Sequence, residues 1–140
     1  MSQPAGYSNT PLVRKLGIKP GHRLLIVNAP ADFAATLGPL PTGVTIVSGT
    51  GRDLDVVLLF LTEAKELAAR FPKLTARLVP DGMIWVAWPK GTSGVATDLN
   101  FAVVQSTGLA TGLVDTKVCA IDAVWSGLKF VYRLVDRPKK

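Results

Sequence analysis

The chain has 140 residues, of which 48% are hydrophobic, 19% are charged and only one is cysteine. This length suffices for one domain with a buried core, the composition is too apolar for a disordered protein, and a lone cysteine excludes an internal disulfide. The formal net charge of +6 suggests an anionic partner, but residues 1–31 and 129–140 carry +4 each, whereas residues 32–128 carry −2.

The two basic ends therefore flank a mildly acidic body, in which basic and aromatic side chains are not interleaved. A nucleic-acid groove needs such interleaving, so we expect the ends to be solvated, and nucleic acid is not the expected partner. No apolar run approaches the roughly 18 residues of a membrane span, and the start of the chain lacks the basic and apolar regions of a secretory signal. The expected location is the bacterial cytoplasm.

The first residues, 1–10, are polar and predict an extended arm. A single α/β domain is expected over residues 11–136, followed by a basic tail at 137–140. The domain begins with a short predicted helix, because Thr10 offers an N-cap oxygen and Pro11 suits the first helical position.

This first helix is predicted over residues 12–16 and ends at Gly17. The apolar run 23–27 then shows no polar alternation, which is typical of a central parallel strand. Similar patterns predict a helix over 32–37 and strands over 44–47 and 55–61.

The best predicted helix begins at Thr62, which supplies a cap ahead of two acidic residues. Pro72 is expected to kink or split this helix. The apolar stripe of the helix consists of Leu67, Phe71, Leu74 and Leu78. A turn at Asp81-Gly82 then leads into a fourth predicted strand over 83–88.

A further helix is predicted from a cap at Thr97-Asp98 to about residue 107, with Gly108 and Gly112 marking its end. Apolar and polar residues then alternate over 113–121 and 128–135, which predicts an antiparallel hairpin. Its first strand is expected to show Val114, Val118 and Ala120 on one face and Asp115, Lys117 and Cys119 on the other. Together these elements predict a three-layer, Rossmann-like α/β fold whose mostly parallel sheet ends in an antiparallel edge hairpin.

Residues 16–27, 55–60 and 78–86 resemble the first, fourth and fifth strand regions of class I S-adenosylmethionine-dependent methyltransferases. The terminal hairpin is similar to the antiparallel ending of that fold. Over nearly its whole length the chain also resembles a small bacterial family of unknown function. The segments that carry this second resemblance are 5–18, 88–90, 93–99, 108–120 and 125–128. The first resemblance implies a methyltransferase-like fold, with S-adenosylmethionine as the cofactor of an ordinary member.

The expected cofactor loop departs from that pattern. Methyltransferases place glycines after the first strand so that the backbone can approach the cofactor, but loop 28–32 has no glycine, and Pro30 has no N–H. Ser48 and Gly49 replace the acidic residue that would bind the ribose hydroxyls. We therefore predict no cofactor and a catalytically degenerate domain acting as a small binding or regulatory module. The alternative is a small enzyme acting on an anionic small molecule, which could be an S-adenosylmethionine-dependent methyltransferase. A third hypothesis is nucleic-acid binding through the basic termini.

Ligands of open α/β sheets bind beyond the carboxyl ends of the parallel strands. The loop after the fourth strand offers a cation, hydroxyl groups and two glycines, which suit an anion, and Arg52 could join it. The candidate ligand-binding residues are Asn28, Ser48, Gly49, Arg52, Trp88, Lys90, Ser93 and Thr97. The competing interpretation is an ordinary polar loop, with Trp88 packed in the core.

No catalytic residue and no metal site is predicted. His22 lies at the wrong end of the predicted sheet, Cys119 has only Lys117 nearby as an activator, and Ser126 lacks a nucleophile elbow. We expect Cys119 to be a half-buried structural thiol. The edge hairpin would allow a homo-oligomer, but the sequence selects no symmetry.

Overall fold

The computed structural model describes residues 11–136, so the predicted arm and basic tail lie outside the described residues. Its strands are β1 (Arg23–Val27), β2 (Thr45–Val47), β3 (Leu54–Phe60), β4 (Leu78–Pro89), β5 (Leu113–Ala120) and β6 (Trp125–Tyr132). Its helices are α1 (Leu12–Lys15), α2 (Phe33–Leu37), α3 (Ala64–Thr75) and α4 (Phe101–Ala110), with short 3-10 turns at Gly91–Ser93 and Leu134–Asp136. Most predicted elements are thus present, with shifted ends.

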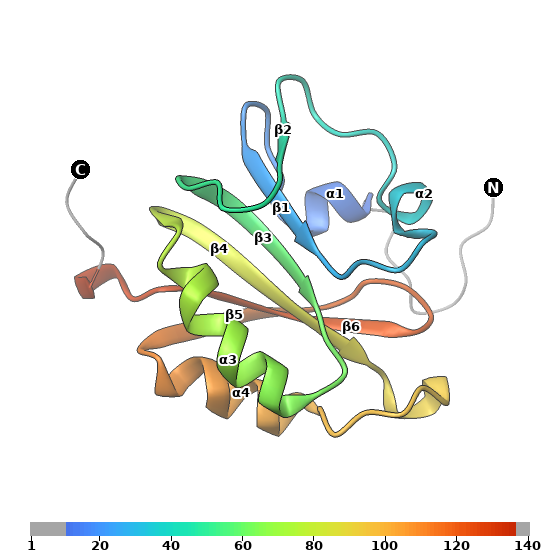
Figure 1. Cartoon of the computed structure of the whole chain (residues 1–140). Coiled ribbons are helices and arrows are strands. Elements are labelled where there is room, and N and C mark those ends of the chain that lie inside the picture. The colour runs from blue at the N-terminus through green and yellow to red at the C-terminus, as the bar shows by residue number, and fades with distance from the viewer. Residues whose placement is uncertain (1–10, 137–140) are drawn as a thin grey trace.

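The strands form one six-stranded sheet in the order β2-β1-β3-β4-β6-β5 (Figure 1). The first four strands are parallel, and the β5–β6 hairpin joins β4 in antiparallel pairing. Helices α1 and α2 lie on one face of the sheet, and α3 and α4 lie on the other. The predicted three-layer, mostly parallel fold with an antiparallel edge hairpin is confirmed.

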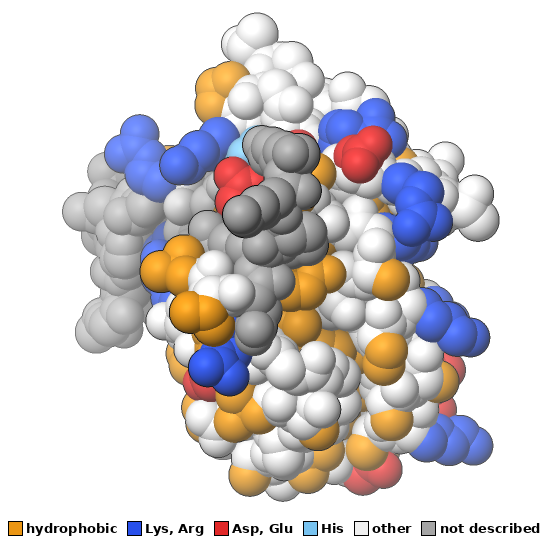
Figure 2. Space-filling view, turned by 90° about the vertical axis from the view of Figure 1, so that its left-hand side faces the viewer, with side chains coloured by type: hydrophobic (Ala, Val, Ile, Leu, Met, Phe, Trp, Pro, Cys, Tyr) orange, Lys and Arg blue, Asp and Glu red, His pale blue; other side chains and the backbone are white. Residues whose placement is uncertain are grey.

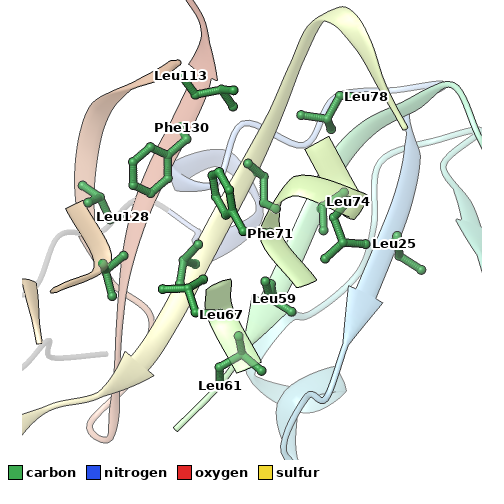
Figure 3. Packing of buried hydrophobic residues seen from close by; sticks show 14 of the residues in the cluster. Leu25, Leu59, Leu61, Leu67, Phe71, Leu74, Leu78, Leu113, Leu128 and Phe130 are labelled. Atoms are coloured by element: carbon green, nitrogen blue, oxygen red, sulfur yellow. The ribbon is translucent and has the colours of Figure 1, made fainter. Parts of the chain in front are cut away.

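Each face of the sheet has its own hydrophobic core. In the α1–α2 core, the fully buried indole of Trp85 donates its N–H to the carbonyl oxygen of Leu16 at 2.9 Å. In the α3–α4 core, the rings of Phe71 and Phe130 meet edge to face, with centroids 5.2 Å apart (Figure 3). Trp88 belongs to this second core and is 6% exposed. These buried aromatic rings join the helices to the sheet on both sides.

Helix α4 ends later than predicted. Gly108 lies inside the helix, where an added Cβ would come within 2.0 Å of the Phe130 ring. Its missing side chain lets the helix approach β6, so this glycine marks a close contact instead of the helix end. Gly112 does follow the helix, with a left-handed φ of 93°.

The helix starts also differ from the prediction. Pro11 is the N-cap residue of α1 instead of its first helical residue, and Thr10 lies outside the described residues. Helix α4 is capped by Asn100, whose side chain accepts from the N–H of Val103 at 2.9 Å. The predicted cap Asp98 is displaced from α4 because its carboxylate binds another helix, as described below.

Helix α3 is continuous through Pro72, so the expected split does not occur. Pro72 lies close to the C-terminal end of the helix, where the loss of one backbone hydrogen bond is tolerated. Leu67, Phe71 and Leu74 form the buried stripe as predicted, whereas Leu78 already belongs to β4.

Two strand irregularities were missed by the sequence patterns. Asp81-Gly82 forms no separate turn but lies inside β4, where the pairing with β3 shifts between Leu54 and Val56. A Cβ on Gly82 would lie 2.8 Å from the Leu54 carbonyl oxygen, so only glycine fits there.

The pairing of β5 with β6 shifts between Asp115 and Lys117, so Asp115 and Lys117 point to opposite faces of the sheet. Asp115 accepts from the Gln105 side chain of α4 at 3.1 Å, whereas Cys119 is buried in the α1–α2 core. Val118, predicted to be on an apolar face, is 56% exposed. The predicted faces of β5 are therefore wrong, because a bulge breaks the alternation.

Candidate functional site

The parallel strands end at one edge of the sheet, and Asn28 is the first residue beyond β1. Its φ of 61° is left-handed, a conformation that glycine adopts most readily and asparagine tolerates better than most residues. The carbonyl oxygen of Pro30 then accepts from the N–H of Phe33 at 3.0 Å and closes the turn into α2. The chain thus makes a turn at the position where methyltransferases have glycines, but the residues of this turn all carry side chains.

This loop lacks the glycines that the methyltransferase resemblance implies. Ala29 packs against the α1–α2 core, and Pro30 has no backbone N–H to offer. At the end of β2, Ser48 and Gly49 are exposed, and the next acidic residue along the chain, Asp53, directly precedes β3 at the amino edge. Pro30 therefore supplies no backbone donor at this turn, and no carboxylate directly follows β2.

The segment before α4 folds back over the carboxyl end of β3. The hydroxyl of Thr97 donates to the Thr62 carbonyl oxygen at 2.6 Å, and a carboxylate oxygen of Asp98 accepts from the N–H of Ala64 at 2.7 Å. Asp98 therefore caps α3, and the predicted side-chain cap from Thr62 is absent. This contact satisfies the first N–H of α3 and fixes the loop in place.

Among the predicted candidates at the end of β4 and beyond it, the side chains of Trp88 and Ser93 have structural contacts, whereas Lys90 is held through its backbone. The backbone N–H of Lys90 donates to the Val124 carbonyl oxygen at 2.7 Å, and the Ser93 hydroxyl accepts from the N–H of Val95 at 3.2 Å. Trp88 packs in the α3–α4 core, as the competing interpretation expected. None of these side chains lines the cavities described below.

Arg52 does not lie at the carboxyl edge. Its carbonyl oxygen accepts from Nε of Arg23, the first residue of β1, at 3.1 Å, and the Arg23 N–H donates to Asp55 at the start of β3 at 2.8 Å. Arg52 is therefore at the amino edge and does not join Lys90 as expected. The reason is that the loop from β2 to the parallel β3 contains no helix, so residues 48–53 must run back to the opposite edge.

A cavity of about 450 Å³ opens between the β1–β2 ends and α3. It brings three predicted residues together with two that the sequence analysis missed. The predicted residues are Asn28, Ser48 and Gly49, and the missed residues are Arg70 and Arg77. Neither arginine lies in a loop at the carboxyl end of a strand, where ligand-binding groups were expected, since Arg70 lies on α3 and Arg77 just beyond it.

Arg77 ties the β2–β3 loop to the end of α3. Its Nε donates to the Gly51 carbonyl oxygen and its Nη2 to the Gly49 carbonyl oxygen, both at 2.7 Å. These two bonds hold the loop against the sheet and form one wall of the cavity. The remaining guanidinium N–H groups of Arg77 are not used in these bonds.

Two further cavities lie on the α1–α2 side. One, of about 480 Å³, lies between the end of α1 and residues 39–41. The other, of about 400 Å³, runs along α2 and is lined almost entirely by apolar residues, including Ile46, which is 52% exposed.

His22 and Cys119, which could act as a base or a nucleophile, have structural roles. Nδ1 of His22 accepts from the N–H of Lys19 at 3.1 Å within the predicted turn. Cys119 is 7% exposed, and burial raises the pKa of its thiol, although Lys15 and Lys117 act in the opposite direction. Across residues 11–136, no three His, Cys, Asp or Glu side chains group in a way that could hold a metal ion.

We expect Cys119 to react with Ellman's reagent about tenfold more slowly in the folded chain than in urea at pH 8, because the sulfur is buried and its thiolate is disfavoured. Since the pKa is raised, the folded-state rate should still increase with pH above 9.0, the usual value. Stopped-flow absorbance measures both rates. A folded-state rate that reaches a plateau below pH 8 would instead indicate an activated nucleophile.

No protein-family model matches the sequence, and no curated protein matches it. Solved structures do match it in fold. An S-adenosylmethionine-dependent methyltransferase of Aquifex aeolicus has a TM-score of 0.62 at 12% identity, over 85% of this chain and 86% of that one. A precorrin-6y C5,15-methyltransferase of Geobacter metallireducens has a TM-score of 0.59 at 11% identity, over 87% and 86%.

The magnesium protoporphyrin IX methyltransferase of Synechocystis, solved with bound S-adenosylhomocysteine, has a TM-score of 0.55 at 12% identity, over 87% of this chain and 78% of that one. At these identities the likeness establishes the methyltransferase-like fold alone. None of the described helices combines the length and apolar content needed to cross a bilayer.

Proposed function

We propose that this chain is a small cytoplasmic binding or regulatory module that uses a methyltransferase-like fold without its methyl donor. The observation that carries the proposal is the turn after β1, where glycine is absent, the half-buried Ala29 packs against the α1–α2 core and Pro30 offers no N–H. The cofactor pyrophosphate or carboxylate sites of related folds depend on free backbone N–H groups at this position. A module that has lost them keeps the scaffold but not the chemistry.

The contact between α3 and the segment before α4 supports the same conclusion. Asp98 occupies the first N–H of α3 with its carboxylate, and Thr97 binds the end of β3. A carboxylate at this helix start repels a second anion. The carboxyl edge above β3 is therefore closed by the chain's own polar groups.

The alternative is an S-adenosylmethionine-dependent enzyme that holds its cofactor in a different way. It is favoured by the fold, since one matching methyltransferase structure contains bound S-adenosylmethionine. In that case the donor would lie beyond β1 and β2 without glycine contacts. The same experiment separates the two proposals.

We expect no binding of S-adenosylmethionine or S-adenosylhomocysteine, that is, a Kd weaker than about 1 mM, or less than about 4 kcal/mol of binding free energy. Isothermal titration calorimetry at 25 °C tests this, and a thermal shift with each ligand detects binding whose enthalpy is near zero. Micromolar binding of either ligand in either assay would overturn the proposal and favour the enzyme. A methyltransferase assayed in the same buffers serves as the positive control.

A further inference from the structure

The cavity beside α3 shares Asn28, Ser48 and Gly49 with the carboxyl edge of β1 and β2, but it extends from there along α3, where its charged residues lie. It lies on the α3 face of β1 and β2, where the loop of residues 48–53 runs across the sheet in place of a helix (Figure 1). Its volume of about 450 Å³ lies within the range typical of small-molecule sites. The chain thus has room for a ligand next to, and not over, the turn at Pro30.

The charged groups that line this cavity have one sign. Arg70 and Arg77 are both present, and among the described residues that line it none is acidic. The Arg70 side chain is exposed and makes no hydrogen bond or ion pair with the described part of the chain, whereas the Arg77 side chain still has N–H groups to donate. Because two guanidinium groups line the cavity without a carboxylate, the cavity favours the binding of an oxyanion, which each guanidinium can hold through paired N–H groups.

The surface charge alone would not single out this place. In the space-filling view, Lys and Arg side chains lie along the right margin and also at the left of the molecule, with acidic side chains among them (Figure 2). The distinguishing property is the wall of the cavity, whose remaining residues are largely apolar. These apolar residues include Leu25, Val27, Val47 and Leu74.

The polar groups at the strand ends complete the site. Asn28 turns with a left-handed backbone at the end of β1, and Ser48 follows β2 directly, so both lie at the cavity rim. An amide and a hydroxyl can each donate one hydrogen bond to an oxyanion. The cavity therefore combines an apolar wall with cationic and neutral donors at its edge.

We propose that this cavity binds a small organic oxyanion, a phosphate or a carboxylate carried on an apolar body. The apolar body packs on Leu25, Val47 and Leu74, and the oxyanion faces Arg70. This proposal names the ligand class of the binding module and rests on that function; it shares Asn28 with loop 28–32, but its cations are Arg70 on α3 and Arg77 just beyond it. If the probes below fail to bind, the S-adenosylmethionine result stands unchanged, whereas micromolar S-adenosylmethionine binding would overturn the function on which this proposal rests.

The test is a titration of the 15N-labelled chain followed by NMR. Phenyl phosphate and benzoate are the two probes, and phenol and inorganic phosphate are the references that lack the anion or the apolar body. We expect one or both probes to shift the amide signals of Asn28, Ser48 and Gly49, and to bind at least fivefold more tightly than either reference. Binding of phenol or inorganic phosphate as tight as that of both probes would overturn the proposal.

Variants locate the site on α3. Arg70→Ala should weaken probe binding about tenfold, because a charge-assisted hydrogen bond contributes roughly 1.5 kcal/mol or more. Lys73→Ala is the matched control, since it removes the same charge from an exposed position on the same helix that does not line the cavity. Ser48→Asp places a carboxylate at the rim and should abolish binding while the spectrum remains that of a folded chain. Equal effects of the two α3 variants would overturn the assignment.

Discussion

Replacing Phe71 by alanine is expected to lower the free energy of unfolding by about 4 kcal/mol, a large share of the total for a domain of this size. Phe71 is 0% exposed, and its ring meets that of Phe130 at an interplanar angle of 79°. Removing it loses both the buried apolar area and the edge-to-face contact, and leaves a cavity between α3 and β6. The surrounding sheet is fixed by its hydrogen bonds and can close that cavity only in part.

Urea unfolding followed by far-UV circular dichroism at 25 °C measures this change. Phe101→Ala is the matched control, because Phe101 begins α4 and is 41% exposed. Its expected cost is below about 1 kcal/mol. Equal losses for the two variants would mean that the α3–α4 core is not organised around the Phe71–Phe130 contact.

The order of the elements could be predicted because local patterns determine it. The apolar run 23–27 and the buried stripe of α3 each reflect burial that the residue spacing already encodes. The bulges could not be predicted, since each depends on a neighbouring strand. Gly82 lies inside β4 because its backbone approaches the Leu54 carbonyl oxygen, a partner 28 positions earlier in the chain. The faces of β5 could not be predicted either, because its bulge depends on the pairing with β6.

The candidate site was predicted only in part, for a related reason. Asn28 and Ser48 follow recognisable strands, so their position at the carboxyl edge follows from topology. Arg52 was misplaced because a sequence does not tell whether a six-residue connection stays at one edge or runs back to the other. Arg70 and Arg77 were missed because ligand groups were expected on loops. One signal could have identified them. The edge strand β2 is followed by no helix, so basic residues on the polar side of α3 can face the space beside it.

Replacing Gly108 by alanine is expected to destabilise the chain by about 2 kcal/mol, although alanine is the better helix former by about 1 kcal/mol. The added methyl group would lie 2.0 Å from a ring carbon of Phe130, which is 0% exposed and held on its other side by Phe71. Neither ring can move without opening the core, so α4 must shift away from β6. The clash therefore outweighs the gain in helix propensity.

Two comparisons separate the clash from the helix effect. Ser106→Ala, at an exposed position of the same helix, should stabilise the chain by about 0.5 kcal/mol, because alanine is the better helix former and the change removes only a local hydrogen bond from the Ser106 hydroxyl to the Ala102 carbonyl oxygen. In the background Phe130→Leu, whose side chain leaves space above β6, Gly108→Ala should lose at least half of its cost. Such coupling is expected only for residues in direct contact. If Gly108→Ala stabilised the natural chain in urea unfolding, the close approach of α4 to β6 would be wrong, and so would the packing that positions the edge hairpin beside β4.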